Sequence, residues 1–310
     1  DQLHDQVLEM SARHAIDILV VTSGAESLGS IAPLYGTPRE RIEPFLDKLD
    51  IQRFFEDLGI PAPPLSAEGE CPAVVKPRRG AGGWRNAVIR TPEELTRWQE
   101  NWPDVPYITQ HLVGGTPASV SCIADGTGAR AVAINEQLQR GGEASPYGYS
   151  GSITPFFHPL AGRMAALAEQ IAAASGCVGS VGIDFMVDRD RVWAIEINPR
   201  FQATLDTVEM ATGCSVFEMH VDACRGRMPD RMPESRQVSV RSILFADRDM
   251  TAATDLSRLS PAVADIPWPG TSFEEGQAVI SVYGWGRSRE DALCMLDNTI
   301  TTVHRYMEQW

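Results

Sequence analysis

The sequence lacks the features that would place the protein at a membrane or outside the cell. No apolar run approaches the roughly 18 residues that a membrane-spanning helix requires, and no signal peptide is visible. Its six cysteines, at positions 71, 122, 177, 214, 224 and 294, form no C-x-x-C pair and no metal-binding spacing. Reduced, mostly buried thiols are typical of such a distribution. The sequence therefore predicts a cytoplasmic protein without a membrane partner.

Basic residues are also scarce. The chain of 310 residues has 27 Lys and Arg against 41 Asp and Glu, and its net charge is −14. This charge argues against a nucleic-acid partner, because phosphate backbones require a basic surface. An anionic ligand would need a local group of cations, and five residues could supply it: Lys76, Arg78, Arg79, Arg85 and Arg200. For Arg78, Arg79 and Arg85, solvated surface charge is the alternative.

Two short apolar runs, at 182–187 and 192–198, have the length and the β-branched content of strands. The polar residues between them are turn material, so the pattern predicts an antiparallel hairpin. If residues 189–191 form the loop, Val187 pairs with Trp193. Because side chains alternate along a strand, Trp193 is then expected on the core face.

The same register places metal-type side chains on one face. Asp184 lies opposite Glu196, and Asn198 points the same way as Glu196. Two carboxylates and an amide oxygen, with no His or Cys nearby, suit a hard cation such as Mg²⁺. The cation would also relieve the repulsion between the two carboxylates. Pro199 ends the strand, so Arg200 can leave the sheet and reach an anionic group.

A lysine followed by a glycine-rich turn lies earlier in the chain. Lys76 ends the apolar run 73–75, and Gly80, Gly82 and Gly83 follow it. A lysine at a strand end can hold phosphate as a point charge, and glycines let backbone N–H groups approach phosphate oxygens. The segment is neither a Walker A sequence nor G-x-G-x-x-G. Taken alone, an ordinary mobile hairpin turn is the alternative.

Four motifs follow one another along the chain: Lys48, Lys76 with its glycine-rich loop, Asp184, and Glu196-x-Asn198-Pro199-Arg200. This ordered set resembles that of the ATP-grasp superfamily, and the resemblance extends from about residue 48 to the end of the chain. Segment 264–292 is similar to the carboxyl-terminal part of biotin carboxylase and related carboligases. The chain looks most like the carboxylate–amine ligases typified by tyramine–glutamate ligase, partly because of Tyr149-x-Gly151-x-x-x-Pro155.

The resemblance implies an α/β fold of the α+β ATP-grasp type, with a nucleotide held between a small lid sheet and a larger antiparallel sheet domain. Residues 1–47 are expected to be part of a preceding Rossmann-like domain, truncated because its first strands are absent. Residues 48–110 form the lid subdomain, and residues 111–310 form the large subdomain with the metal site and a C-terminal extension. In the latter, alanine-rich residues 160–175, stopped by Gly176, predict a helix behind the metal hairpin.

The implied activity is ATP- and Mg²⁺-dependent ligation of a small carboxylic acid to an amine. The carboxylate attacks ATP to give an acyl phosphate and ADP, and the amine then displaces phosphate. By analogy, the acid is glutamate-like, the amine is tyramine-like or an amino acid, and the chain forms a homodimer. Two Mg²⁺ ions are implied, with Mn²⁺ as an alternative. Two other classes stay open: a phosphotransferase on the same fold and a non-catalytic nucleotide-binding relative.

The resemblance also assigns roles to individual residues. Arg200 and Lys76 are the catalytic candidates. The nucleotide-binding candidates are Lys48, Lys76, Arg79, Gly80, Gly82, Gly83, Gln110, His111 and Leu112. The metal-ligand candidates are Asp184, Glu196 and Asn198. The candidates for substrate contact are Tyr149, Gly151 and Gln202.

The chain departs from the family pattern at two places. Where biotin carboxylase has Gln-Val-Glu-His, this chain has Gln-Ala-Thr-Leu at 202–205, and Thr204 cannot serve as the base for bicarbonate. Bicarbonate chemistry is therefore discounted. Gln110 stands where many relatives have Glu, and the ribose contact lacks its usual acidic residue, so the choice between ATP and GTP stays open.

Two further features have competing interpretations. His111 could contact the nucleotide or be a hydrogen-bonded structural residue. Residues 141–151 show no clear periodicity and are expected to form a loop, from which Tyr149 could contact the substrate.

Overall fold

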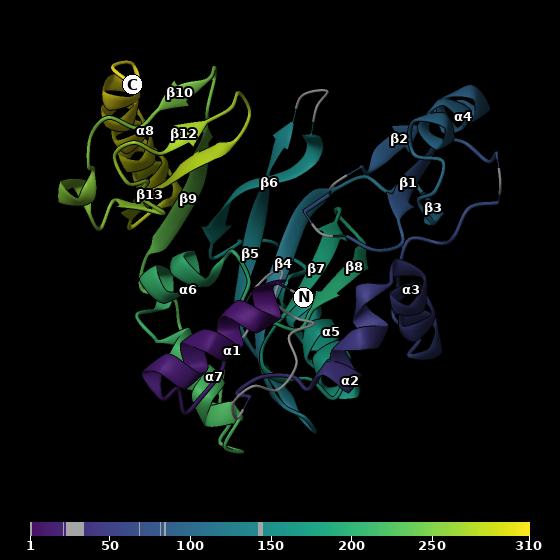
Figure 1. Ribbon diagram of the computed structural model, residues 1–310. Helices are drawn as coiled ribbons and strands as arrows, with labels where there is room; N and C mark the ends of the chain where they lie inside the picture. The colour runs from purple at the N-terminus through teal and green to yellow at the C-terminus, as the bar shows by residue number, and fades with distance from the viewer. Residues whose placement is uncertain are drawn as a thin grey trace.

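A large antiparallel sheet runs through the middle of the computed structural model (Figure 1). The structure describes the chain apart from residues 1, 21, 23–33, 68, 81, 84 and 142–144. Among the described residues, this sheet has eight strands in the order β11-β13-β9-β6-β5-β4-β7-β8. Their bounds are β4 (Thr116–Asp125), β5 (Ala129–Gly141), β6 (Ser145–Thr154), β7 (Val178–Val187), β8 (Val192–Asn198), β9 (Val238–Phe245), β11 (Val263–Ala264) and β13 (Ala278–Gly286).

A smaller sheet lies to one side of the large one (Figure 1). Its described strands run in the order β2 (Ala87–Ile89), β1 (Ala73–Pro77) and β3 (Tyr107–His111). Helix α4 (Pro92–Asn101) covers this sheet, and its Leu95 and Trp98 pack against Val75 and Ile89. Proline suits the first turn of a helix, where the N–H group that it lacks would have no intrahelical partner. Lys76 therefore lies on a strand, β1, that is packed against helix α4.

Helices cover both faces of the large sheet. Helices α3 (Lys48–Asp57) and α5 (Ala161–Ala174) share one core cluster with Cys122 of β4. Helices α6 (Leu205–Thr212) and α7 (Val216–Ala223) share another with Ile123 of the same strand. Adjacent residues of β4 thus face opposite sides, as strand geometry requires. Full burial of a side chain such as Met164 or Ile171 contributes about 1.5–3 kcal/mol to stability.

The C-terminal part extends the large sheet. Helix α8 (Arg289–Met307) begins with a capping box between Ser288 and Asp291 and packs against β13 and β9. The two-residue strands β10 (Met250–Thr251) and β12 (Ser272–Phe273) pair with each other, and a short 3-10 helix, η2 (Ser257–Leu259), lies between them in the chain. Among the described helices, none combines the length and the apolar character needed to span a bilayer.

The ends of two helices follow from identifiable residues. Helix α5 confirms the helix expected at 160–175, and Gly176 follows it with φ +65°, the left-handed conformation typical of a helix stop. The side chain of Asp47 accepts a hydrogen bond from the backbone N–H of Leu49 at 2.9 Å and so caps α3. This cap starts the helix at Lys48.

The β7–β8 hairpin confirms one predicted pair and corrects another. Asp184 lies opposite Glu196, as predicted. Val187 pairs with Val192 and not with Trp193, because the register shifts by one residue next to Asp184. The connection is therefore one residue longer than expected, and a β-bulge restores the register of the acidic pair.

The predicted core position of Trp193 is wrong for the same reason. Val192, Ala194 and Ile197 are buried in the core, whereas Trp193 is only partly buried and its ring centre lies 5.8 Å from the guanidinium carbon of Arg191. A bulge adds one residue to one strand, so alternation counted across it changes face.

A strand occupies most of the segment that was expected to be a loop at 141–151. Strand β6 begins at Ser145 and pairs with β5 on one side and β9 on the other, while residues 142–144 lie outside the described part of the chain. A Cβ on Gly151 would lie 2.0 Å from the backbone oxygen of Arg241 on β9. The close approach of the two strands requires glycine there, which removes part of the side-chain alternation by which a strand is recognised.

The amino-terminal segment contains helix α1 (Gln2–His14), helix α2 (Arg39–Ile42) and the 3-10 helix η1 (Glu43–Leu46). Leu19 and Leu34 form an isolated parallel bridge. His220 of α7 holds this segment, because its Nε2 lies 2.9 Å from the backbone oxygen of Tyr35. Much of the expected Rossmann-like remnant falls within residues 21–33, nearly all of which lie outside the described residues, so that assignment stays a prediction.

Candidate active site

A cavity of about 620 Å³ lies between the small sheet and the large sheet. Residues of β1, of β3 to β9 and of the start of α6 line it, together with residues of several loops. Most of the predicted site residues line it: Lys76, Gly82, Gly83, Gln110, His111, Tyr149, Asp184, Glu196, Asn198, Arg200 and Gln202. The tertiary structure therefore brings together residues from three of the four motifs found in the sequence, all but Lys48.

Asp184 and Glu196 form the acidic centre of the cavity. Asp184 Oδ2 accepts a hydrogen bond from Asn198 Nδ2 at 3.0 Å, and its Oδ1 accepts one from Gln137 Nε2 at 2.8 Å. Burial and the negative charge of Glu196 raise the pKa of Asp184 to about 7. Two like charges on facing strand positions favour the binding of a cation at this place.

The donor set fits a hard divalent cation. Asp184 and Glu196 offer carboxylate oxygens, and Asn198 offers an amide oxygen that accepts a hydrogen bond from Arg200 Nη2 at 2.9 Å. In the described part of the chain, no group of three or more His, Cys, Asp or Glu side chains is placed to hold a metal ion. A site with few protein ligands suits Mg²⁺, which retains water and binds phosphate oxygens. To bind the ion, the amide oxygen of Asn198 would have to give up its hydrogen bond with Arg200.

Two lysines bring positive charge to the acidic centre. Burial lowers the pKa of Lys76 to about 8; the positive charge of Lys48 acts in the same direction, and the negative charge of Glu196 opposes it. Lys48 Nζ donates to the backbone oxygen of Gly80 at 2.6 Å and lies 3.6 Å from Glu196 Oε1. Lys48 thus connects the glycine-rich loop with the acidic pair.

Arg200 and Gln202 follow the β7–β8 hairpin in the chain, and Gln202 turns back toward β7. Arg200 Nη1 donates to the backbone oxygen of Phe201 at 3.2 Å, and Gln202 Nε2 donates to the backbone oxygen of Arg200. A Cβ on Gly182 would lie 2.3 Å from Gln202 Cγ, so glycine at this point of β7 leaves room for the Gln202 side chain. Pro199 ends β8 and allows this turn, as expected.

The other predicted site residues are described but are not among those that line the cavity: Lys48, Arg79, Gly80, Leu112 and Gly151. Arg79 pairs with Glu43 at 3.1 Å, and the side chain of Leu112 is exposed. Gly151 forms the close strand contact with β9. Their predicted roles in binding stay predictions.

Gln110 and His111, two of the predicted nucleotide-binding residues, form contacts within the protein. Gln110 is buried, and its Nε2 donates to Gln52 Oε1 at 2.8 Å and to the backbone oxygen of Pro63 at 3.3 Å. His111 Nε2 lies 3.5 Å from Glu70 Oε1. Both residues line the cavity as well, so a structural contact and a contact with a ligand are compatible at these positions.

The sequence analysis did not single out several polar residues that line the cavity, among them Gln137, Asp206, Arg241 and Asp265. Gln137 reaches Asp184 from β5, and Arg241 lies on β9, about forty residues after the last of the four motifs. A single Gln or Arg within a strand carries no local signal that distinguishes it from a surface residue. Only the pairing of β5 and β9 with β6 places these side chains at the site.

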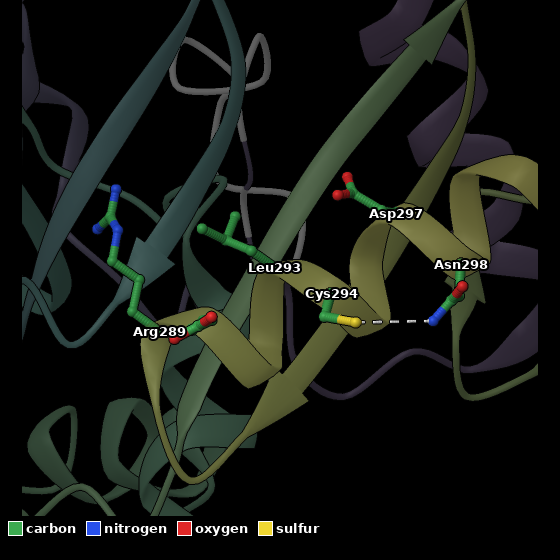
Figure 2. Close-up of a pocket in the computed structure, with 6 residues that line it drawn as sticks. Arg289, Leu293, Cys294, Asp297 and Asn298 are labelled. Carbon is green, nitrogen blue, oxygen red and sulfur yellow. Dashed lines mark hydrogen bonds between the residues drawn. The ribbon is translucent and has the colours of Figure 1, made fainter.

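A second hollow, of about 550 Å³, lies along α8 and is lined by Arg289, Glu290, Leu293, Cys294, Asp297 and Asn298 (Figure 2). Figure 2 shows these side chains spread along one helix, with Arg289 directed away from Cys294 and Asn298. Arg289 forms two hydrogen bonds with Glu136, at 2.5 and 2.9 Å. The lining groups do not converge, so the cavity between the sheets is the better candidate for chemistry.

The class of protein follows from this architecture: a small lid sheet and a large antiparallel sheet enclose a cavity with cations on one side and a pair of acids on the other. A family model described as an ATP-grasp domain matches residues 45–204, which is just over half of the chain. The chain therefore belongs to the ATP-grasp family, as its motifs predicted.

Solved structures share the fold at low sequence identity. The biotin carboxylase domain of the 2-oxoglutarate carboxylase of Hydrogenobacter thermophilus is 14% identical, with a TM-score of 0.81 over 96% of this chain and 77% of that chain. That domain is a dimer in complex with MgADP, ADP and bicarbonate. The biotin carboxylase of Campylobacter jejuni is 15% identical, with the same TM-score and the same shares covered. Pyruvate carboxylase of Rhizobium etli is 14% identical, with a TM-score of 0.78 over 96% of this chain and 31% of that chain. These likenesses confirm the fold.

Proposed function

We propose that the protein is an ATP- and Mg²⁺-dependent ligase that joins a small carboxylic acid to an amine through an acyl phosphate. One observation carries the proposal: Lys76 and Arg200 line the same cavity as the facing acids Asp184 and Glu196. Phosphoryl transfer depends on positioned cations and on acids that hold a metal. Membership of the ATP-grasp family supports the nucleotide, and the MgADP bound to the Hydrogenobacter domain supports the metal.

Different residues of the cavity would bind the metal, the inner phosphates and the terminal phosphate of the nucleotide. Asp184, Glu196 and Asn198 would hold Mg²⁺, which supplies positive charge to the transferring phosphoryl group when it is bound. Lys76 has a pKa of about 8 and is therefore mostly protonated at neutral pH, so it serves as a point charge for the inner phosphates. Arg200 presents a planar cation to the terminal phosphate and then to the acyl phosphate.

The chemistry requires positioning more than proton transfer by the protein. A carboxylate oxygen attacks the γ-phosphorus of ATP, the bond to the bridging oxygen breaks, and ADP leaves. The amine nitrogen then attacks the acyl carbon, loses one proton, and inorganic phosphate leaves. Thr204 supports the choice of an amine over bicarbonate, because this buried hydroxyl lies 3.2 Å from Ser121 Oγ and offers no carboxylate base.

The proposal also covers the two substrates, the role of Tyr149 and the oligomeric state. A glutamate-like acid and a tyramine-like or amino-acid amine are the first candidates, by analogy with the ligases that the motifs resemble. Tyr149 would contact the substrate; its hydroxyl donates to the backbone oxygen of Ala203 at 3.3 Å, and burial raises its pKa. The dimer of the Hydrogenobacter domain supports a homodimer.

The test of the function is Mg²⁺-dependent ADP release, measured while carboxylic acids are supplied singly and in pairs with amines, with mass detection of the products. We expect release that requires both partners and a product lighter than their sum by one water. Release with a single partner and a product that gains a phosphate would indicate a phosphotransferase instead. Nucleotide binding without any release would indicate a non-catalytic relative.

The glycine-rich loop offers a matched pair of variants. Gly82 and Gly83 have left-handed backbones, at φ +68° and +73°. A Cβ on Gly83 would lie 2.6 Å from the backbone oxygen of Tyr147, whereas one on Gly82 would meet nothing described within 4 Å. We expect Gly83→Ala to weaken MgADP binding about tenfold relative to Gly82→Ala, because only the former displaces the loop from the β6 side of the cavity.

Calorimetric titration of both variants with MgADP measures this difference. The two substitutions impose the same backbone strain, so the comparison isolates the contact with Tyr147. Equal affinities would show that the position of the loop against β6 plays no part in nucleotide binding.

A further inference from the structure

The far end of the cavity, beyond Arg200, is built around a second arginine. Arg241 on β9 lines the cavity together with Asp206, in the first turn of α6, and Asp265, directly after β11. The side chain of Arg241 is only 12% exposed, while those of Asp206 and Asp265 are 42% and 64% exposed. The cation therefore lies beneath the two carboxylates.

Arg241 directs its guanidinium at the protein. Its Nε donates to Ser281 Oγ at 3.1 Å, and its Nη2 donates to the same hydroxyl at 2.7 Å and to Asp265 Oδ2 at 2.9 Å. Its Nη1 donates to the backbone oxygen of Ala203 at 2.8 Å and lies 3.6 Å from Asp206 Oδ2. All three nitrogens are engaged, so an anionic ligand would have to displace a charged partner.

In each of the two carboxylates, one oxygen atom makes all of the described contacts with the protein. Tyr283 donates its hydroxyl hydrogen to Asp206 Oδ2 at 2.6 Å, and Ser281 donates to Asp265 Oδ2 at 2.5 Å. Every hydrogen bond and ion pair described for these two side chains ends on an Oδ2 atom. The Oδ1 atoms remain for a ligand in the cavity, on a framework whose geometry is set by buried groups.

The charges at this end favour a cation. Arg241 supplies one positive charge against the two negative charges of Asp206 and Asp265, which leaves a net charge of about −1 on the cluster. An ammonium group has three N–H donors and can bind two carboxylate oxygens at once. A carboxylate ligand at this place would be repelled by Asp206 and Asp265. The guanidinium of Arg241, which could attract it, already forms hydrogen bonds with the protein.

We propose that Asp206 and Asp265 bind the ammonium form of the amine substrate, which releases one proton to water before its nitrogen attacks the acyl carbon. This inference rests on the proposed ligase function. It places the phosphates of the nucleotide near Lys76 and Arg200, at one end of the cavity, and the amine near Arg241, at the other. Asp206 and Asp265 are then specificity-determining residues, and Arg241 is a positioning residue that holds both carboxylates. The acid substrate is accordingly bound on the metal side of the amine.

Binding of the amine can be measured without turnover in the presence of MgADP. Tyramine, putrescine and histamine serve as probes, each compared by calorimetry with the neutral compound in which a hydroxyl replaces the amino group. We expect at least one amine to bind about tenfold or more tightly than its alcohol partner, because charge-assisted hydrogen bonds are the stronger kind. No preference for any amine in the wild-type protein would overturn the proposal.

The variants Asp206→Asn and Asp265→Asn, singly and together, keep the size of the side chains and remove the charge. The double variant should bind amine and alcohol within about twofold of each other. Asp247→Asn is the matched control, because this exposed carboxylate pairs only with its neighbour Arg248 in the described contacts. A double variant that retains the wild-type preference for the amine would overturn the proposal.

The two proposals can fail separately. In the ligase assay, with both substrates supplied, Asp206→Asn and Asp265→Asn should raise the KM for the amine about tenfold and leave the KM for the acid within about twofold of the wild-type value. If the wild-type protein binds amines selectively but never forms an amide, the ligase function fails and the ammonium site stands. If amides form with an unchanged KM in both variants, the ammonium site fails alone.

Discussion

Replacing Glu196 by Gln is expected to lower Mg²⁺-dependent ADP release by about a thousandfold or more. The substitution keeps the size of the side chain and removes one of two facing acids, so the cavity retains only Asp184 as a carboxylate on this hairpin. Loss of a metal ligand removes several kcal/mol of charge stabilisation from the transition state. The rate should be measured over a wide range of Mg²⁺ concentration, since a weakened site recovers part of its activity at high metal.

The fold should tolerate this change. Glu196 raises the pKa of Asp184 by its negative charge, so neutral Gln at 196 relieves a repulsion within the hairpin. The same change removes the attraction of Glu196 for Lys48 and Lys76, so the melting temperature should stay close to that of the wild-type protein. Glu218→Gln, at an exposed position of α7, is the control for the loss of one negative charge. Full turnover in Glu196→Gln at low Mg²⁺ would rule out the metal site proposed here.

Replacing Arg200 by Lys should lower kcat about a hundredfold with little change in stability. Lysine keeps the charge, but it cannot reproduce a planar group that donates to Asn198 and to the backbone oxygen of Phe201 at the same time. Removal of a preorganised donor that faces developing charge costs about two to four kcal/mol in known active sites. Single-turnover measurement of acyl phosphate formation isolates the step that should slow.

The control for this substitution is Arg191→Lys. Arg191 is exposed in the loop of the same hairpin, so its replacement repeats the chemical change without reaching the cavity. We expect wild-type rates in this variant. An unchanged kcat in Arg200→Lys would show that Arg200 acts only as a distant charge.

The β7–β8 hairpin shows how far strand periodicity predicts the positions of site residues. The pairing of Asp184 with Glu196 was predicted because side chains in a hairpin follow a period of two from the loop outward. The predicted pair of Val187 with Trp193 was wrong, and the acidic pair survived because a bulge compensates for the longer loop. Bulges depend on packing against neighbouring strands, so a count from the loop cannot locate them.

The far end of the cavity could not have been predicted in the same way. Arg241, Asp206 and Asp265 come from a strand, a helix and a turn that follow all four motifs in the chain. None of them has a neighbour in sequence that shares its role. Their contacts depend on the pairing of β9 with β6 and β13, which joins segments far apart in the chain.

The sequence by itself determined the class of this protein, the presence of metal-type ligands on one hairpin, and the cations that accompany them. These properties are local, because they depend on strand period, on turn residues and on the order of motifs along the chain. The tertiary structure alone decided which predicted residues share a cavity, that Gly151 serves strand packing, and that Gln137 and Arg241 belong to the site. The reason is physical: side-chain neighbours across a sheet are set by the register of non-local strand pairs, which the burial of the whole core selects.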